Sequence, residues 1–407
     1  MSFGDDAENG TAGARRPLTA QLDNGLTLVY EAMPWLPSIS ASLVLPYGSA
    51  TDPEGLEGAT NVLQEWMQRG AGDLDSRALS DALEDLGVRW SANAGRESSG
   101  ITASFLASEL DDVMPLLASV VMSPRFDEME FEASREVALQ ELHSLEDAPS
   151  TKMFDLLVTR FVTSPQGRSP YGTAEGLAAL TPDAVRQEAE RNLGPQGAVL
   201  ALAGGSDWES VQAAARRAFG SWTGVGRETP PVETASPGRS HVEAETSQVQ
   251  IGLAYPSPAQ GTDEAYVYSV ALNVLSGSMG SRLFTEVREK RGLVYSVSAF
   301  TRYLRGFGYT VGYAGTTPER ADETLDVFLA ELRRLAKGVT ADELERAKTG
   351  ILSGLVMQGE SSGATAGRLA GDTFNLGRPR TLEEITSKIE AVTLKDVNDY
   401  IAANPVP

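Results

Sequence analysis

The 407-residue sequence contains no cysteine and only two histidines, His143 and His241. The absence of cysteine excludes disulfides, thiolate nucleophiles and cysteine-based zinc sites. The two histidines lie 98 positions apart, so no pair has the four-residue spacing that places two imidazoles on one helical face. Neither histidine has neighbours that suggest a Ser-His-Asp triad, and we expect both to be surface or structural residues.

Long apolar runs are also missing. No run approaches the roughly 20 apolar residues that a membrane-spanning helix needs. The first residues, "MSFGDDAENGTAGARR", are polar and acidic and lack the apolar core of a secretory signal. We expect residues 1–16 to form a disordered tail, and we expect a cytoplasmic chain without a membrane partner.

Basic residues are outnumbered by acidic residues, 34 to 56, which gives a formal net charge of −22. A nucleic-acid partner is therefore not expected, because binding to phosphates needs clustered lysine and arginine. Solubility is the simpler explanation of the acidity. The alternative is an acidic cavity for basic peptides, which the sequence alone does not establish.

The sequence repeats itself, which indicates two related halves. "EFEASREVALQEL" (Glu130–Leu142) resembles "ELERAKTGILSGL" (Glu343–Leu355), and "TPDAVRQEAERN" (Thr181–Asn192) resembles "TLKDVNDYIAAN" (Thr393–Asn404). The second segment starts 39 positions after the end of the first in one half and 38 positions after it in the other half. The conserved order and spacing make a chance match implausible.

The repeat and the composition place the domain boundaries. A segment rich in Pro, Gly, Ser and Thr predicts a linker over residues 223–246. The linker separates an N-terminal domain, 17–222, from a C-terminal domain, 247–407. Strand and helix patterns are mixed without strict alternation in both domains. We therefore predict an α+β fold of two homologous domains, each a largely antiparallel sheet backed by helices.

Individual segments support this fold class. "QLDNGLTLVYEA" predicts two strands joined by an Asn-Gly turn, and Gly197–Gly205 predicts a buried strand. Further strands are predicted in "SISASLVLPYGS" and "SQVQIGLAYPSP". Helical periodicity predicts helices over Ser76–Leu86, Ser108–Met122 and Pro318–Lys337.

The segment Gly58–Gly72, "GATNVLQEWMQRGAG", predicts a short helix with an apolar stripe of Val62, Leu63, Trp66 and Met67. On this helix Asn61 and Glu65 lie one turn apart, with Gln64 beside them. This spacing is typical of a metal-binding helix, but every key residue has been replaced.

In these motifs the chain resembles the pitrilysin, insulinase and mitochondrial-processing-peptidase family of zinc peptidases. The resemblance runs from about Arg16 to the C-terminus. It is carried by "LDNGLTLVYEAMPWLPSISASLVLPYGSATDPEGLEGATNVLQEWMQRG", "REVALQELHSLEDAP", "SGSMGSRLFTEVREKRGLVYSVSAF" and "GVTADELERAKTGIL". It implies a clamshell in which this chain forms one half of a chamber and a partner chain forms the other.

The resemblance also implies that the zinc site is degenerate. Active members carry an inverted motif, His-x-x-Glu-His, and a distal Glu. The first-His position holds Asn61, the catalytic-Glu position Gln64 and the second-His position Glu65, while the distal Glu is present as Glu141. Oxygen donors suit Ca²⁺ or Mg²⁺ better than zinc, and an amide cannot act as a general base. We expect no cofactor bound by this chain, zinc in the partner subunit, and no peptide hydrolysis by this half.

The second half keeps residues that the resemblance assigns to catalysis. In "VREKRGLVYS", Arg288 and Tyr295 have the spacing of the Arg and Tyr that reach the substrate carbonyl beside the zinc. Such donors stabilise an oxyanion. The alternative is that Arg288 is a solvated helix residue and Tyr295 a core aromatic. Arg291 is a nearby alternative whose spacing fits less well.

Two further segments are candidate substrate-binding sites. Gly277 and Gly280 lie where the family's non-catalytic mitochondrial subunit has a glycine-rich substrate loop, although a plain helix-entry turn is an equal alternative. Asn93 and Ala94 resemble the family's edge strand, on which an extended peptide is added as another strand.

The sequence thus predicts the non-catalytic subunit of a heterodimeric zinc metallopeptidase. Its partners are a homologous subunit that bears His-x-x-Glu-His and a peptide substrate. Two alternatives remain, namely a structural scaffold subunit of a larger complex and a homodimer that binds peptides without hydrolysis.

Overall fold

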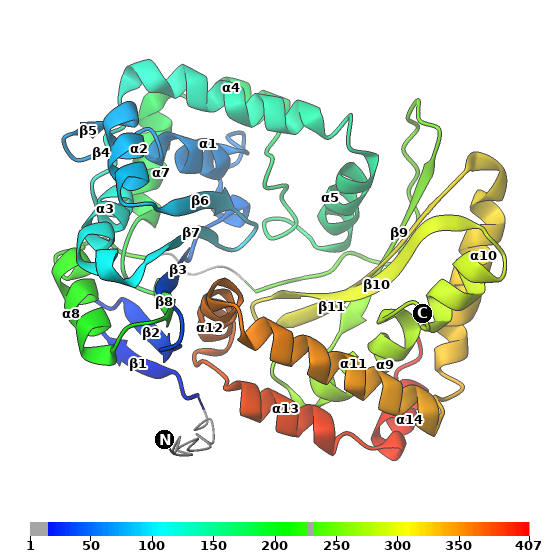
Figure 1. Cartoon of the computed structure of the whole chain (residues 1–407). Helices are drawn as coiled ribbons and strands as arrows, with labels where there is room; N and C mark the ends of the chain where they lie inside the picture. The colour runs from blue at the N-terminus through cyan, green and yellow to red at the C-terminus, as the bar shows by residue number, and fades with distance from the viewer. Residues whose placement is uncertain (1–14, 227–230, 407) are drawn as a thin grey trace, which may run out of the picture.

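The computed structural model describes residues 15–226 and 231–406. Residues 1–14 of the expected tail and 227–230 of the expected linker lie outside the described residues. The described chain combines helices with two main sheets, which confirms the predicted α+β class (Figure 1). In this part of the chain no helix is both long and apolar enough to cross a membrane.

The first sheet has six strands in the order β1-β2-β8-β3-β7-β6. β2 and β8 run parallel, and every other pair of neighbours is antiparallel. β6 therefore lies at one edge of the sheet. The strands are β1 (Leu18–Gln21), β2 (Thr27–Ala32), β3 (Ser38–Leu45), β6 (Arg89–Ala94), β7 (Ser99–Leu106) and β8 (Val199–Gly204).

Two features of this sheet follow from local sequence. The predicted turn joins β1 to β2, and Gly25 has a φ of +96°, which favours glycine. The side-chain nitrogen of Asn24 donates to the carbonyl oxygen of Phe219 at 2.7 Å and anchors the turn. Every residue of β8 is buried, because β8 is a central strand covered on both faces.

Helices and short elements complete the first half, and most of its helices share one apolar core with the sheet. The largest buried side chain of this core is Trp66. The elements are η1 (Ser49–Thr51), α1 (Ala59–Met67), β4 (Gly70–Ala71), β5 (Leu74–Asp75), α2 (Ser76–Asp85), η2 (Ala107–Glu109), α3 (Leu110–Met122), α4 (Glu128–Ser144), α6 (Ala174–Ala179), α7 (Pro182–Asn192) and α8 (Trp208–Phe219).

The second sheet is antiparallel, in the order β10-β11-β9, and is backed by its own helices. The helix predicted over Pro318–Lys337 is α10, and the helix predicted over Ser108–Met122 is α3. In both, a short 3-10 turn takes the place of the first predicted residues. The elements are β9 (Val249–Ser257), α9 (Asp263–Ser276), β10 (Val294–Leu304), β11 (Phe307–Thr316), η4 (Pro318–Arg320), α10 (Ala321–Leu335), α11 (Ala341–Gly359), α13 (Leu382–Ala391) and α14 (Leu394–Ala403).

The two sheets repeat one pattern, as the sequence repeat predicts. The order β3-β7-β6 in the first sheet corresponds to β9-β11-β10 in the second. A glycine with positive φ precedes the edge strand in both halves, Gly87 at +65° and Gly292 at +60°. The repeated sequence segments fall on α4 and α11 and on α7 and α14. β10 is therefore the counterpart of the edge strand β6.

Each half also lends a helix to the other half. α12 (Ser362–Leu376), from the second half, packs on β2, β3 and β8 of the first sheet (Figure 1). α5 (Pro149–Phe161), from the first half, packs on β9 of the second sheet. The face of α12 that meets the first sheet carries Leu369, Ala370 and Phe374, which are buried against Val29 and Val199. The exchange joins the two halves through apolar contacts.

Leu369→Ala tests this exchange. Leu369 is fully buried between α12 and the first sheet, so its truncation leaves a cavity and lowers the free energy of unfolding by about 2–5 kcal/mol. Met357→Ala, on the exposed face of α11, is the control and changes that free energy by about 0.5 kcal/mol or less. Urea denaturation followed by circular dichroism measures both. Equal values for the two variants would show that α12 is not packed as described.

Candidate functional site

The position of α1 is set by a buried aspartate. The carboxylate of Asp52 accepts hydrogen bonds from the backbone nitrogens of Gly58, at 2.7 Å, and Thr60, at 2.9 Å. The hydroxyl of Thr60 donates to the same carboxylate at 2.6 Å. Burial raises the pKa of Asp52 to about 6, while these hydrogen bonds oppose the rise. The first turn of α1 is thereby tied to the loop before it.

The structure brings Asn61 and Glu141 together. The side-chain nitrogen of Asn61 donates to Glu141 Oε2 at 2.9 Å, which links α1 to α4. Asn61 is buried, whereas Glu141 is exposed. A direct amide–carboxylate hydrogen bond thus joins the first-His position of the family motif to the distal-Glu position.

Gln64, at the position of the family's catalytic Glu, lies deeper. Its side chain is only 2% exposed, and its nitrogen donates to the hydroxyl of Tyr47 at 3.2 Å. Its Oε1 has no hydrogen-bond partner among the described residues. Tyr47 was not identified from the sequence, because an apolar stretch followed by Pro-Tyr-Gly gives no sign of a contact with α1.

Glu65, at the second-His position, interacts with Arg69 one turn later. The closest atoms of the pair, Glu65 Oε2 and Arg69 Nη2, are 3.8 Å apart, and Arg69 also pairs with Glu130 at 3.1 Å. Burial raises the pKa of Glu65, the charge of Arg69 lowers it, and the charge of Glu141 raises it.

These four side chains do not fit zinc. Two are amides and two are carboxylates, whereas catalytic zinc sites use histidine as a principal ligand. The Asn61 amide faces Glu141 with its nitrogen, which cannot ligate a metal. Among the described residues no three His, Cys, Asp or Glu side chains are grouped so as to hold a metal ion. Gln64, moreover, cannot take a proton from a metal-bound water.

The second half presents Arg288 and Tyr295 side by side. Arg288 lies on η3 (Phe284–Glu289), a π-helical turn, and Tyr295 lies near the start of β10. The guanidinium carbon of Arg288 is 4.8 Å from the ring centre of Phe284 and 5.4 Å from that of Tyr295. Tyr295 is 81% exposed, so it is not a core aromatic. Cation–π contacts with both rings orient the guanidinium.

Arg291 is engaged elsewhere. Its guanidinium donates to the backbone oxygen of Glu286 at 2.7 Å and to the Glu286 carboxylate at 2.9 Å. Lys290 donates to the same carboxylate at 2.7 Å. Arg288 makes no ion pair with any residue in the described part of the chain. Its donors are therefore available to a group outside this chain, which favours Arg288 over Arg291.

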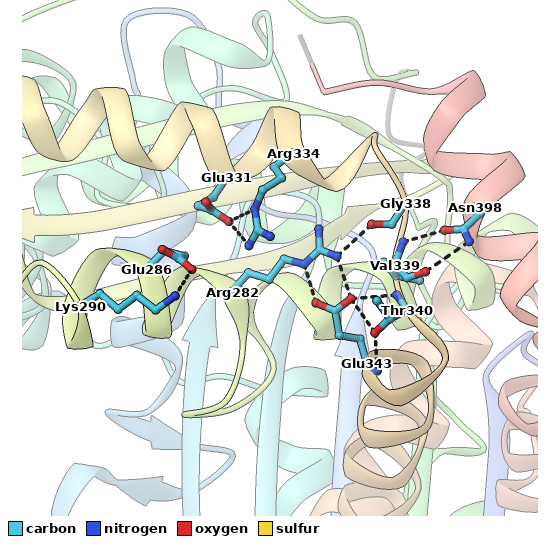
Figure 2. Close-up of polar contacts among 10 residues, drawn as sticks. All are labelled: Arg282, Glu286, Lys290, Glu331, Arg334, Gly338, Val339, Thr340, Glu343 and Asn398. Carbon is cyan, nitrogen blue, oxygen red and sulfur yellow. Dashed lines mark hydrogen bonds and ion pairs between the residues drawn. The ribbon is translucent and has the colours of Figure 1, made fainter.

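An ion pair between a buried arginine and a half-buried glutamate anchors the segment that carries Arg288. Arg282 donates through Nε and Nη2 to the two carboxylate oxygens of Glu343, at 2.7 and 2.8 Å, and through Nη2 to the carbonyl oxygen of Gly338 (Figure 2). Glu343 also completes the capping box of α11 with Thr340. The sequence analysis missed this anchor, although the Thr-x-x-Glu pattern at Thr340 was a readable signal of the cap.

The predicted edge strand has the position that the sequence indicates. Asn93 pairs with Gly100 and Ala94 with Ser99, both on β7, and β6 has no second neighbour among the described strands. Its outer edge therefore presents backbone donors and acceptors to which an extended peptide can pair. The role of Asn93 and Ala94 in binding a substrate stays a prediction.

Gly277 and Gly280 lie in the turn that follows α9. Gly277 is the C-terminal cap of α9, where a Cβ would lie 2.2 Å from the side chain of Asn273. The backbone nitrogen of Gly280 donates to the Ser278 hydroxyl at 3.2 Å. Close packing at the helix end accounts for Gly277, and its role in substrate binding stays a prediction.

Glu343→Gln tests the anchor through its pH dependence. Hydrogen bonding to Arg282 lowers the pKa of Glu343 to about 2. Because this pKa lies below that of an unfolded glutamate, the stabilisation is present above about pH 4.5 and is lost as the pH falls toward 2. The variant should lower the free energy of unfolding by about 1.5–3 kcal/mol at pH 7 and by progressively less toward pH 3. Urea denaturation at several pH values measures this difference.

The matched control is Glu345→Gln, which changes an exposed residue of the same helix. It should show a difference near zero at every pH. A Glu343→Gln effect that is constant between pH 7 and pH 3 would contradict the assignment of its stabilisation to the charge.

Comparisons with known proteins agree with the motifs. The model of the insulinase family, peptidase family M16, matches residues 27–174, and the model of the peptidase M16 inactive domain matches residues 179–351. An uncharacterized zinc protease of Mycobacterium tuberculosis is 30% identical over 397 residues, which cover 95% of this chain and 90% of the relative. The uncharacterized zinc protease YmxG of Bacillus subtilis is 29% identical over 383 residues, 92% of each chain.

Solved structures share the whole fold. A peptidase M16 inactive domain from Pseudomonas fluorescens superimposes with a TM-score of 0.86 at 22% identity, over 95% of this chain and 94% of that one. A protease from Helicobacter pylori gives a TM-score of 0.85 at 18% identity, over 96% of both chains. These likenesses confirm the predicted architecture. The matches over nearly the full length show that the chain belongs to peptidase family M16, the insulinase family.

Proposed function

We propose that this chain is the non-catalytic subunit of a two-chain zinc peptidase. A homologous partner with an intact His-x-x-Glu-His helix holds the zinc, and this chain closes the chamber and supplies Arg288 and Tyr295. One observation carries the proposal. The chain keeps an exposed arginine, without an ion pair among the described residues, stacked on an exposed tyrosine, although its own helix at the position of the metal motif lacks the zinc ligands.

The first half supports a non-catalytic role through its hydrogen bonds. Asn61 binds Glu141 directly, and Gln64 is an amide in a buried position with no capacity to accept a proton from water. General-base catalysis contributes on the order of 10²–10⁴ in rate, so the loss of the base removes a large share of any activity. Hydrolysis therefore requires a metal and a base from a second chain.

The second half supports a role in the partner's site. In peptide hydrolysis negative charge develops on the carbonyl oxygen of the scissile bond. The Arg288 guanidinium offers several N–H donors and Tyr295 one O–H donor, and both side chains are exposed. Held together by stacking, the pair can donate to one oxygen from two directions. The partner supplies the zinc and its chemistry, and this chain positions the two hydrogen-bond donors, Arg288 and Tyr295.

Peptide is the substrate class that the relatives support. The matched proteins of Mycobacterium tuberculosis and Bacillus subtilis are described as zinc proteases. The free edge of β6 gives an extended peptide a surface for backbone pairing in this chain. A purely structural scaffold would have no use for an exposed Arg–Tyr pair.

Arg288→Ala and Tyr295→Phe test the proposal in the assembled pair of chains. Loss of one oxyanion donor should lower kcat by about 10²–10³, equivalent to about 2.7–4 kcal/mol, because the contact strengthens in the transition state. Arg291→Ala is the matched control and should retain kcat within about twofold, since Arg291 is already bound to Glu286. Hydrolysis of a fluorogenic peptide, measured over a range of substrate concentrations, separates kcat from KM.

This chain alone should not hydrolyse the peptide. Unchanged kcat in the Arg288 and Tyr295 variants would contradict the shared site. Cleavage by this chain alone that a chelator inhibits and Gln64→Ala abolishes would contradict the non-catalytic role.

A further inference from the structure

A cavity of about 440 Å³ lies at the seam between the two halves. Its volume is within the range of ligand-binding pockets, about 300–1,000 Å³. Both halves and the exchanged helices α5 and α12 contribute to its wall. The lining includes Glu97, Phe154, Tyr171, Phe300, Leu304 and Phe374.

The cavity has an apolar wall. Phe154 of α5 packs against Phe300 of β10, with their ring centres 5.9 Å apart. Leu304, at the end of β10, is buried. Phe374 of α12 lies under the guanidinium of Arg305, 4.5 Å from the ring centre. The apolar side chains of these four residues line one cavity, which suits an apolar group.

Four charged side chains line the cavity. Arg96, Glu97 and Asp155 are satisfied within the chain, and Arg302 lies over the ring of Phe300, with its guanidinium carbon 5.0 Å from the ring centre. Arg96 and Asp155 form an ion pair at 2.6 Å, and each side chain is only 12% exposed. Glu97 is buried and accepts a hydrogen bond from the backbone nitrogen of Arg305 at 2.7 Å. An incoming basic group would meet Arg302 and would have to compete with Arg96 for Asp155, whereas an uncharged group would not.

The cavity continues the edge strand. Arg96, Glu97 and Ser98 line it, and they belong to the turn, residues 95–98, that follows the end of β6. The cavity thus begins where β6 ends.

We propose that this cavity receives one aromatic or large aliphatic side chain of an extended peptide paired with the edge of β6. The inference rests on the proposed function, because it takes peptide as the ligand. The strand edge binds the peptide backbone without regard to sequence, and the cavity adds the preference for an apolar side chain.

Two glycines of α12 provide a test with a matched control. Gly371 lines the cavity and Gly367, one turn earlier, does not. A Cβ at either position meets nothing within 4 Å, so a side chain is accommodated at both. Gly371→Leu should fill part of the cavity, and Gly367→Leu should leave it open. Both changes replace a helical glycine, so their effects on α12 itself are alike.

The measurement is the affinity of the full chain for fluorescent nine-residue peptides of Ser and Thr with a central Phe, Leu, Ala or Lys. Fluorescence polarisation should give binding about tenfold tighter for Phe and Leu than for Ala or Lys, from burial of one apolar side chain. Gly371→Leu should abolish this preference, and Gly367→Leu should retain it.

Equal affinity for all four peptides, failure of the chain to bind any of them, or a preference that survives Gly371→Leu would overturn the proposal. The outcome is separable from that of the proposed function. A preference of the predicted kind in a chain that never activates a zinc-bearing partner would leave the cavity assignment intact and refute the shared active site. Hydrolysis that depends on Arg288 without any apolar preference would support the shared active site and refute the cavity assignment.

Discussion

The burial of α12 against the first sheet is the contact on which the arrangement of the molecule depends. Leu369, Ala370 and Phe374 leave water there together with Val29 and Val199, although α12 and these strands come from opposite halves. α5 makes the reciprocal contact with the second sheet. Each half has an apolar core of its own, and burial of apolar surface, the main favourable term in folding, joins the two halves at this contact. The two candidate sites are thereby held on one continuous unit.

The two candidate sites differ in what their side chains do. At the first, α1 is the helix that the family resemblance equates with the metal helix. Asp52 fixes its start, its apolar stripe is buried, and an Asn61–Glu141 hydrogen bond joins it to α4. At the second, Arg288 and Tyr295 remain exposed and stacked, on a turn anchored by Arg282. A chain without zinc ligands but with solvent-facing donors is suited to supply those donors to the active site of another subunit.

Much of the fold was predictable because its signals are local. The turn at Gly25, the buried strand β8 and the helix α1 each follow from a few neighbouring residues. The exchange of α5 and α12 was not predictable, because periodicity identifies an apolar face without identifying the sheet that covers it. The Arg282–Glu343 pair joins residues 61 positions apart, and single-sequence patterns do not pair such distant charges. At the candidate site, residue identities came from the family resemblance, while the Asn61–Glu141 hydrogen bond and the contact of Gln64 with Tyr47 required the structure.

The measurement that tests the central claim most directly is affinity purification of this chain, tagged, from cells that express it naturally, followed by mass spectrometry of what is retained. The account predicts one homologous chain of similar length that carries His-x-x-Glu-His, recovered in a ratio near one to one, and peptide hydrolysis by the recovered pair. Recovery of this chain only with copies of itself, or with proteins that lack a zinc motif, would contradict a shared active site.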